Sequence, residues 1–146
     1  MLDGQGADEL LAGYIAYQFC HIRGLIREFC ILRAAREFLG LFRHHRDFLS
    51  YGLTQFFARK RHRSLLRSEN SHFPRYRGTL SEALETDLMR ANLPYLLHWE
   101  DRTSMAFSIE ARVPYLDYRV VEFLASLPAD QKIRGGVTKF ILRKAI

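Results

Sequence analysis

The sequence predicts a mainly α-helical chain with little β-strand. Apolar residues recur at helical spacing, as at Phe38, Leu41 and Phe42. The run Thr79-Leu80-Ser81-Glu82 has the pattern of a capping box, which predicts a helix from about residue 80 toward Ala91. With 146 residues, of which 48% are hydrophobic, the chain can bury a core of its own.

The N-terminal segment Asp3-Gly4-Gln5-Gly6-Ala7-Asp8-Glu9 combines glycines with carboxylates ahead of an apolar, helix-like stretch. Gly4 and Gly6 let the backbone take positive φ and approach a ligand closely. One interpretation is a capped helix start, in which Asp8 and Glu9 complement the helix dipole. The other is a loop whose amides hold phosphate oxygens and whose carboxylates bind Mg²⁺. The spacing by itself favours the first.

Positive charge concentrates between residues 20 and 78, in a chain of net charge +6. Leu25, Phe29 and Leu32 keep helical spacing, so we expect basic amphipathic helix here. The charge would permit binding to nucleic acid, an anionic membrane or an acidic protein. No zinc-finger or RNA-recognition signature accompanies it, which favours a solvated helical face.

Pro94 suits the first turn of a further helix, with Leu93, Leu96 and Leu97 on its apolar face. The charged triplet Glu100-Asp101-Arg102 falls within this helix, between apolar neighbours. Partly buried charges need ionic partners or a ligand. The triplet is therefore either an internal salt-bridge network or part of a site.

The C-terminal third predicts two more helices. Val113-Pro114 forces an extended turn after Arg112, and Asp117 can cap a helix whose apolar face includes Leu124. Thr138 is expected to open a last helix that continues to the end of the chain.

Two segments taken together carry a resemblance: DGQGADELLAGY at residues 3–14 and LPYLLHWEDRTSMAFSIEARVPYLDYRVVEFLASLP at residues 93–128. The pair resembles the synthetase domain of glutamine-dependent asparagine synthetases. The resemblance implies that residues 1–146 are a mainly helical part of an α/β adenine-nucleotide-hydrolase-like (PP-loop) synthetase domain. Residues 3–14 would be its nucleotide-site loop and helix, 20–78 a basic helical insertion, and 79–146 the helical part of the synthetase site.

The same resemblance implies roles for single residues. ATP and Mg²⁺ are the implied cofactors, with Mg²⁺ held at the pyrophosphate by Asp8. Arg112 would organise the site. The implied nucleotide-binding residues are Asp3, Gly4 and Gly6, and the implied catalytic residues are Gln5, Glu100, Asp101 and Arg102.

The implied reaction is ATP-dependent conversion of aspartate to asparagine through an aspartyl-adenylate, with ammonia supplied by glutamine. Gln5 departs from the pattern, because many relatives have Glu at this position and an amide cannot serve as a base. An amidotransferase acting on another carboxylate is therefore the related alternative. From a different class, the alternative is a non-catalytic basic helical module that binds nucleic acid or a protein partner.

Some parts expected of such an enzyme do not occur in this sequence. These are the N-terminal cysteine of a glutaminase domain and the Ser-Gly-Gly-x-Asp-Ser loop that cradles pyrophosphate. A lysine-bearing loop is expected downstream of Ile146. The resemblance thus implies that the glutaminase domain and the remainder of the synthetase domain are partners of this chain, which by itself would not turn over.

Other features exclude several classes of protein. No apolar run is long enough to span a membrane and no signal peptide precedes the motif, so the cytoplasm is the expected location. Cys20 and Cys30 lack the spacing of metal or redox motifs and are expected to be free thiols. Nucleic acid is not an expected partner.

Overall fold

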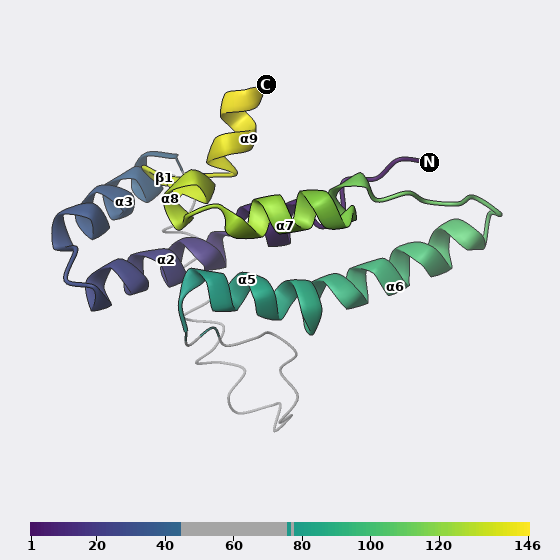
Figure 1. Cartoon of the computed structure of the whole chain (residues 1–146), viewed down its shortest axis with the longest axis horizontal. Helices are drawn as coiled ribbons and strands as arrows, with labels where there is room; N and C mark the ends of the chain where they lie inside the picture. The colour runs from purple at the N-terminus through teal and green to yellow at the C-terminus, as the bar shows by residue number, and fades with distance from the viewer. Residues whose placement is uncertain (45–75, 77) are drawn as a thin grey trace, which may run out of the picture.

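The computed structural model describes residues 1–44, 76 and 78–146, and this part of the chain is mostly helical (Figure 1). Its strands form one antiparallel hairpin, with Ile133 opposite Thr138 and Arg134 opposite Val137. The elements in chain order are α1 (Ala7–Leu11), α2 (Ile15–Arg27), α3 (Ile31–His44), α5 (Leu80–Met89), α6 (Asn92–Met105), η1 (Pro114–Leu116), α7 (Tyr118–Ser126), α8 (Ala129–Lys132), β1 (Ile133–Arg134), β2 (Val137–Thr138) and α9 (Phe140–Ala145).

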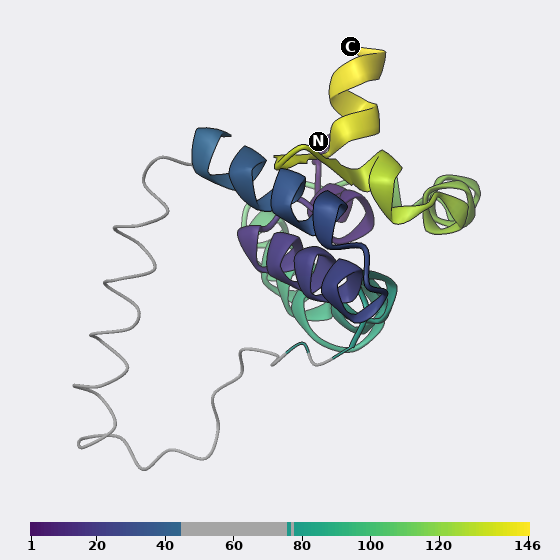
Figure 2. The same ribbon diagram turned by 90° about the vertical axis from the view of Figure 1, so that its left-hand side faces the viewer.

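One core cluster forms where α2 packs between α3 and α5, as Figure 2 shows. Tyr17 is wholly buried there, and its hydroxyl donates to Asp87 Oδ2 at 2.5 Å. Asp87 is also wholly buried and accepts a second hydrogen bond from the Tyr76 hydroxyl. The buried residues of this cluster are Ala12, Tyr17, Cys20, Leu80, Ala83, Leu84 and Ile133.

The second core cluster places α1 against α7. Leu10 and Leu11 pack with Leu124, and Leu116 and Val120 cover them. Because α1 also contacts α5, this short helix is held between elements from the second half of the sequence. The loop before α1 is held by the second half of the sequence too, through backbone hydrogen bonds with Arg112.

Local capping signals are confirmed. The Thr79 hydroxyl accepts from the Glu82 amide at 3.4 Å, and the Glu82 carboxylate accepts from the Thr79 amide at 2.8 Å, so α5 begins with the predicted capping box. Pro94 lies in the first turn of α6. Asp117 caps α7 by accepting from the Arg119 amide at 3.0 Å.

The described part of the basic region is helical, as expected, but Leu25, Phe29 and Leu32 do not share one helix. α2 ends at Arg27, and Phe29 takes a left-handed conformation with φ of 57°, so that α3 can fold back along α2. Phe29 and Leu32 are 89% and 88% exposed. Because the turn between α2 and α3 is short, the apolar residues on either side of it keep helical spacing by chance. Periodicity therefore did not reveal the turn. Residues 45–75 and 77 of the expected basic insertion lie outside the described residues.

The last helix starts later than expected. Thr138 pairs with Ile133 in the hairpin, and α9 begins at Phe140 after Lys139, which has a φ of 52°. A two-residue strand is too short to be detected from alternation, so the hairpin was not foreseen.

The hairpin turn is fixed by contacts with α2 and α3. The two carboxylate oxygens of Glu37 accept from the amides of Gly135 and Gly136 at 2.8 and 2.9 Å, and Gln18 Nε2 donates to the Gly136 carbonyl at 3.0 Å. The backbones approach so closely that a Cβ on Gly40 would lie 2.0 Å from the Gly135 oxygen. These contacts determine where the residues after the turn, including Lys139, are placed.

No helix built from the described residues combines the length and apolar character that crossing a bilayer requires.

Candidate functional site

The loop that carries the glycine motif runs beside the segment that precedes η1. Asp3 N donates to the Arg112 carbonyl, and Arg112 N donates to the Met1 carbonyl, both at 2.8 Å. Gly6 has a φ of 89°, and a Cβ there would lie 2.4 Å from Leu116 Cδ2. Both the backbone conformation and the available space therefore require glycine at this position. Arg112 thus helps to position the loop through its backbone.

Glu100 of α6 meets this loop at Asp3 and Gln5. Both Glu100 carboxylate oxygens are shielded from solvent. The pKa of Glu100 is raised, first by the adjacent Asp3 carboxyl group and then by burial, while the Gln5 amide opposes the shift. The loop at residues 3–6 and Glu100 of α6 therefore lie near each other.

The other two members of the triplet point elsewhere. Asp101 and Arg102 are exposed, and neither side chain makes a hydrogen bond or ion pair with the rest of the described chain. The Gly4 amide donates to Asp3 Oδ1 at 2.6 Å, which tightens the loop. Of the predicted catalytic residues, the structure brings together Gln5 and Glu100. The roles assigned to Asp101 and Arg102 stay predictions.

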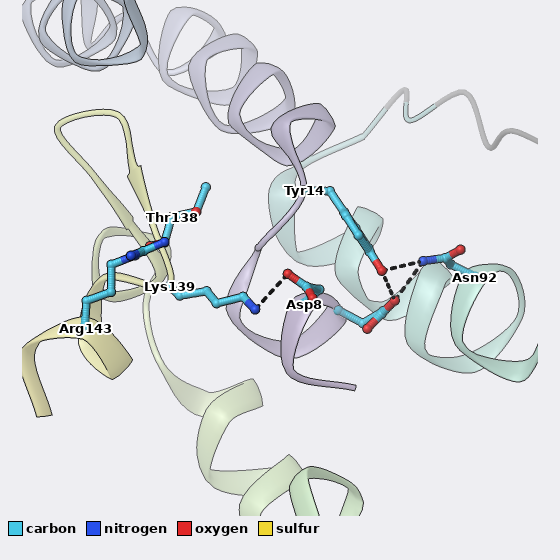
Figure 3. Close-up of polar contacts among 7 residues, drawn as sticks. Asp8, Tyr14, Asn92, Thr138, Lys139 and Arg143 are labelled. Carbon is cyan, nitrogen blue, oxygen red and sulfur yellow. Dashed lines mark hydrogen bonds and ion pairs between the residues drawn. The ribbon is translucent and has the colours of Figure 1, made fainter. Parts of the chain in front are cut away.

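Asp8 forms an ion pair with Lys139, at 2.9 Å between Oδ1 and Nζ (Figure 3). Their side chains are 37% and 25% exposed, so the pair is open to an added group. Gly13 makes the pair possible, because a Cβ there would lie 1.6 Å from Asp8 Oδ1 and 2.7 Å from Lys139 Cε. Lys139 N also donates to the Leu11 carbonyl at 3.2 Å.

Sequence reasoning missed Lys139, because it expected a functional lysine only beyond Ile146. The signal available in the sequence was a lysine shortly after the tight turn at Gly135-Gly136, where the backbone changes direction before a helix. Arg143 supports this position by donating from Nε to the Thr138 carbonyl at 2.9 Å.

Glu9 joins α1 to the start of α6. It is 1% exposed and accepts from the Tyr14 hydroxyl at 2.9 Å and from Asn92 Nδ2 at 2.7 Å. Burial, together with the Glu9 carboxylate, raises the pKa of Tyr14 well above its usual range. Glu9 is therefore a structural carboxylate that ties α1 to the start of α6. Figure 3 shows its two donors, Tyr14 and Asn92, pointing toward each other, with Asn92 Nδ2 donating to the Tyr14 hydroxyl at 3.1 Å.

Comparison with known proteins identifies the family of the chain. The family model described as Asparagine synthase matches residues 1–146. The chain belongs to the asparagine synthase family. No solved structure matches it significantly.

Curated relatives of the asparagine synthase family match a limited stretch. An asparagine synthetase [glutamine-hydrolyzing] 3 of Bacillus subtilis is 45% identical over 51 residues, which cover 35% of this chain and 8% of the relative. The asparagine synthetase of Gallus gallus is 44% identical over 46 residues, covering 31% and 8%. A putative asparagine synthetase of Mycobacterium tuberculosis (strain ATCC 25618 / H37Rv) is 46% identical over 46 residues, covering 32% and 7%. The matched stretch thus spans less than a tenth of these relatives.

Among the described residues, no group of three or more His, Cys, Asp or Glu side chains is arranged to hold a metal ion. Mg²⁺ needs no such group, since it is commonly bound by one or two carboxylates together with substrate phosphates. Asp8 fits that use, because its carboxylate stays partly exposed beside Lys139. For this asparagine synthase family chain, the magnesium role of Asp8 remains a prediction.

Proposed function

We propose that this chain contributes the ligase site of a glutamine-dependent asparagine synthetase. In the proposed reaction an aspartate carboxylate oxygen attacks the α-phosphorus of ATP and pyrophosphate leaves. Ammonia derived from glutamine then attacks the acyl carbon of the aspartyl-adenylate, and AMP leaves as asparagine forms. Family membership and the names of the relatives support this proposal. The complete domain would be of the α/β PP-loop type.

The observation that carries the proposal is the place of Glu100 near Asp3 and Gln5: both of its carboxylate oxygens are shielded from solvent without a hydrogen-bond partner among the described residues, and the nearby Asp3 carboxyl raises its pKa. Ammonia must lose a proton when its nitrogen bonds to the acyl carbon, and a carboxylate whose pKa is raised is a better base at neutral pH than an ordinary one. Gln5 can donate and accept hydrogen bonds but cannot take up this proton. Glu100 is therefore the proposed proton acceptor, and Gln5 orients the reacting group.

Asp8 and Lys139 serve the phosphate end of the proposed site. The Lys139 ammonium, 2.9 Å from Asp8, can pair with phosphate oxygens as negative charge moves onto the departing pyrophosphate. Mg²⁺, when bound at Asp8, would neutralise part of the same charge. The Asp8 carboxylate would also hold Lys139 in place before the nucleotide arrives.

The carboxylic acid that receives the ammonia is the less constrained part of the proposal, because Gln5 replaces the glutamate that many relatives have. An enzyme of this type acting on another carboxylate is the second candidate. The test uses the whole gene product that carries this chain, with ATP, Mg²⁺ and glutamine. Pyrophosphate release and the amide product, identified by mass spectrometry, are compared with aspartate and with other carboxylic acids. Release that depends on aspartate and yields asparagine supports the proposal. Release with another acid alone supports the second candidate, and release with none contradicts both.

A further inference from the structure

A surface hollow lies where α2, α3, α8 and β1 meet, and no residue that lines it belongs to the proposed ligase site. Its volume is about 280 Å³, and a second hollow of about 370 Å³ adjoins it. The two share His21, Leu25, Arg33 and Asp130. Figure 1 shows α8 and β1 beside α3, which brings these residues from distant parts of the sequence together. The second volume lies at the lower end of the range for ligand sites and the first just below it, so the two hollows suit a small molecule.

Arg33, Arg36 and Arg134 line this hollow together with the acids Glu37 and Asp130, and a third acid, Glu28, lines the adjoining hollow. The carboxylate of Glu37 already accepts from two backbone amides of the hairpin turn. Asp130 pairs with Arg134 at 3.2 Å. Within the described chain, Arg33 and Arg36 line the hollow without an ion-pair partner. Guanidinium groups bind carboxylate and phosphate through paired hydrogen bonds, so an anion is the ligand that these two residues suit.

The walls of the adjoining hollow are largely apolar. Leu25 and Leu80 are buried, Pro128 and Ala129 lie next to them, and Gly24 adds no side chain. His21 is 8% exposed, and burial lowers its pKa, so its ring is neutral at pH 7 and can both donate and accept a hydrogen bond. The two hollows thus offer the guanidinium groups of Arg33 and Arg36 next to an apolar surface, with the Glu28 carboxylate at the edge of that surface.

We propose that this hollow binds a small organic anion. Its carboxylate or phosphate group pairs with Arg33 and Arg36, and its apolar body lies against Leu25 and Gly24. The site is separate from the loop and Glu100, so its test does not depend on the ligase reaction.

Calorimetric titration of the 146-residue chain with phenyl phosphate, benzoate and inorganic phosphate tests the proposal. Phenyl phosphate and benzoate distinguish a phosphate ligand from a carboxylate ligand, and we expect at least one of them to bind saturably. Inorganic phosphate should bind about tenfold more weakly, since it lacks the apolar body. Absence of saturable binding by both organic probes would overturn the proposal, and equal binding of inorganic phosphate would overturn its apolar part.

Two pairs of substitutions separate a specific site from general attraction to a basic chain. The double variant Arg33→Ala/Arg36→Ala should bind the organic probe about tenfold more weakly or worse. The matched control, Arg27→Ala/Arg43→Ala, removes the same charge from exposed positions on the same helices that do not line the hollow. Its binding should match that of the original chain. Equal losses in both double variants would overturn the site.

Gly24→Leu tests the location without removing charge. A Cβ at Gly24 meets no atom within 4 Å, so the larger side chain can enter the hollow while the helix stays intact. We expect loss of probe binding with unchanged helical circular dichroism. Unchanged binding in this folded variant would show that the anion lies elsewhere.

Discussion

Asp8 Oδ1 and Lys139 Nζ lie 2.9 Å apart, although the two residues come from opposite ends of the chain. Three features hold them there: the absence of a side chain at Gly13, the bond from Lys139 N to the Leu11 carbonyl, and the hairpin turn fixed by Glu37. The pair therefore depends on the packing of the whole described fold. It also gives the proposed ligase site a carboxylate and an ammonium side by side.

Asp8→Asn should abolish most adenylation in the whole gene product. The amide keeps the size of the side chain but removes the charge that would bind Mg²⁺ and hold Lys139, and the loss of one such electrostatic contact typically costs about a hundredfold in rate. Aspartate-dependent pyrophosphate release measures the effect. Glutamine hydrolysis should be largely unchanged. Unaltered pyrophosphate release would mean that Asp8 is only structural.

Lys139→Met should lower the same pyrophosphate release and raise the KM for ATP, because the ammonium that faces the phosphates is lost. Lys144→Met is the matched control, since Lys144 is an exposed lysine on α9. We expect the control to behave like the original protein. If both variants lost activity equally, the effect would come from α9 or from overall charge, and not from the contact with Asp8.

Glu100→Gln should increase stability at neutral pH while lowering amide formation. The folded-state pKa of Glu100 is raised, so its ionisation destabilises the fold as pH rises above the unfolded-state value of about 4.5. The gain over the original chain should therefore be small at pH 4 and larger at pH 7, as measured by urea denaturation. Glu85→Gln, at an exposed position on α5, is the control. A gain independent of pH would contradict the proximity of Glu100 to Asp3.

The glycines at positions 24 and 40 should respond to alanine with opposite signs. Gly24 lies within α2 with open space around it, so Gly24→Ala should stabilise the chain by roughly 0.5–1 kcal/mol. A Cβ on Gly40 would lie 2.0 Å from the Gly135 oxygen, so Gly40→Ala should destabilise the chain by about 1–3 kcal/mol. Urea denaturation of the two variants compares them directly. A neutral Gly40→Ala would show that α3 and the hairpin are not in backbone contact.

The features that could be predicted from the sequence are those that depend on neighbouring residues. The capping box at Thr79 and Glu82, the place of Pro94 in the first turn of α6, and the Asp117 cap each involve hydrogen bonds or sterics within about one helical turn. The two motif segments also indicated the family. A long match of specific residues can be recognised without knowledge of the fold.

Which distant residues meet could not be predicted, because it depends on the packing of the folded chain. Periodicity continued through Phe29, where the chain in fact turns, and no local pattern distinguished the buried Glu9 from the partly exposed Asp8 beside it. Lys139 reaches Asp8 because Gly13 leaves room for the two side chains and Gly40 lets the backbone of α3 approach that of the hairpin turn. Such contacts depend on the fit between surfaces far apart in the sequence, and local propensity carries no information about that fit.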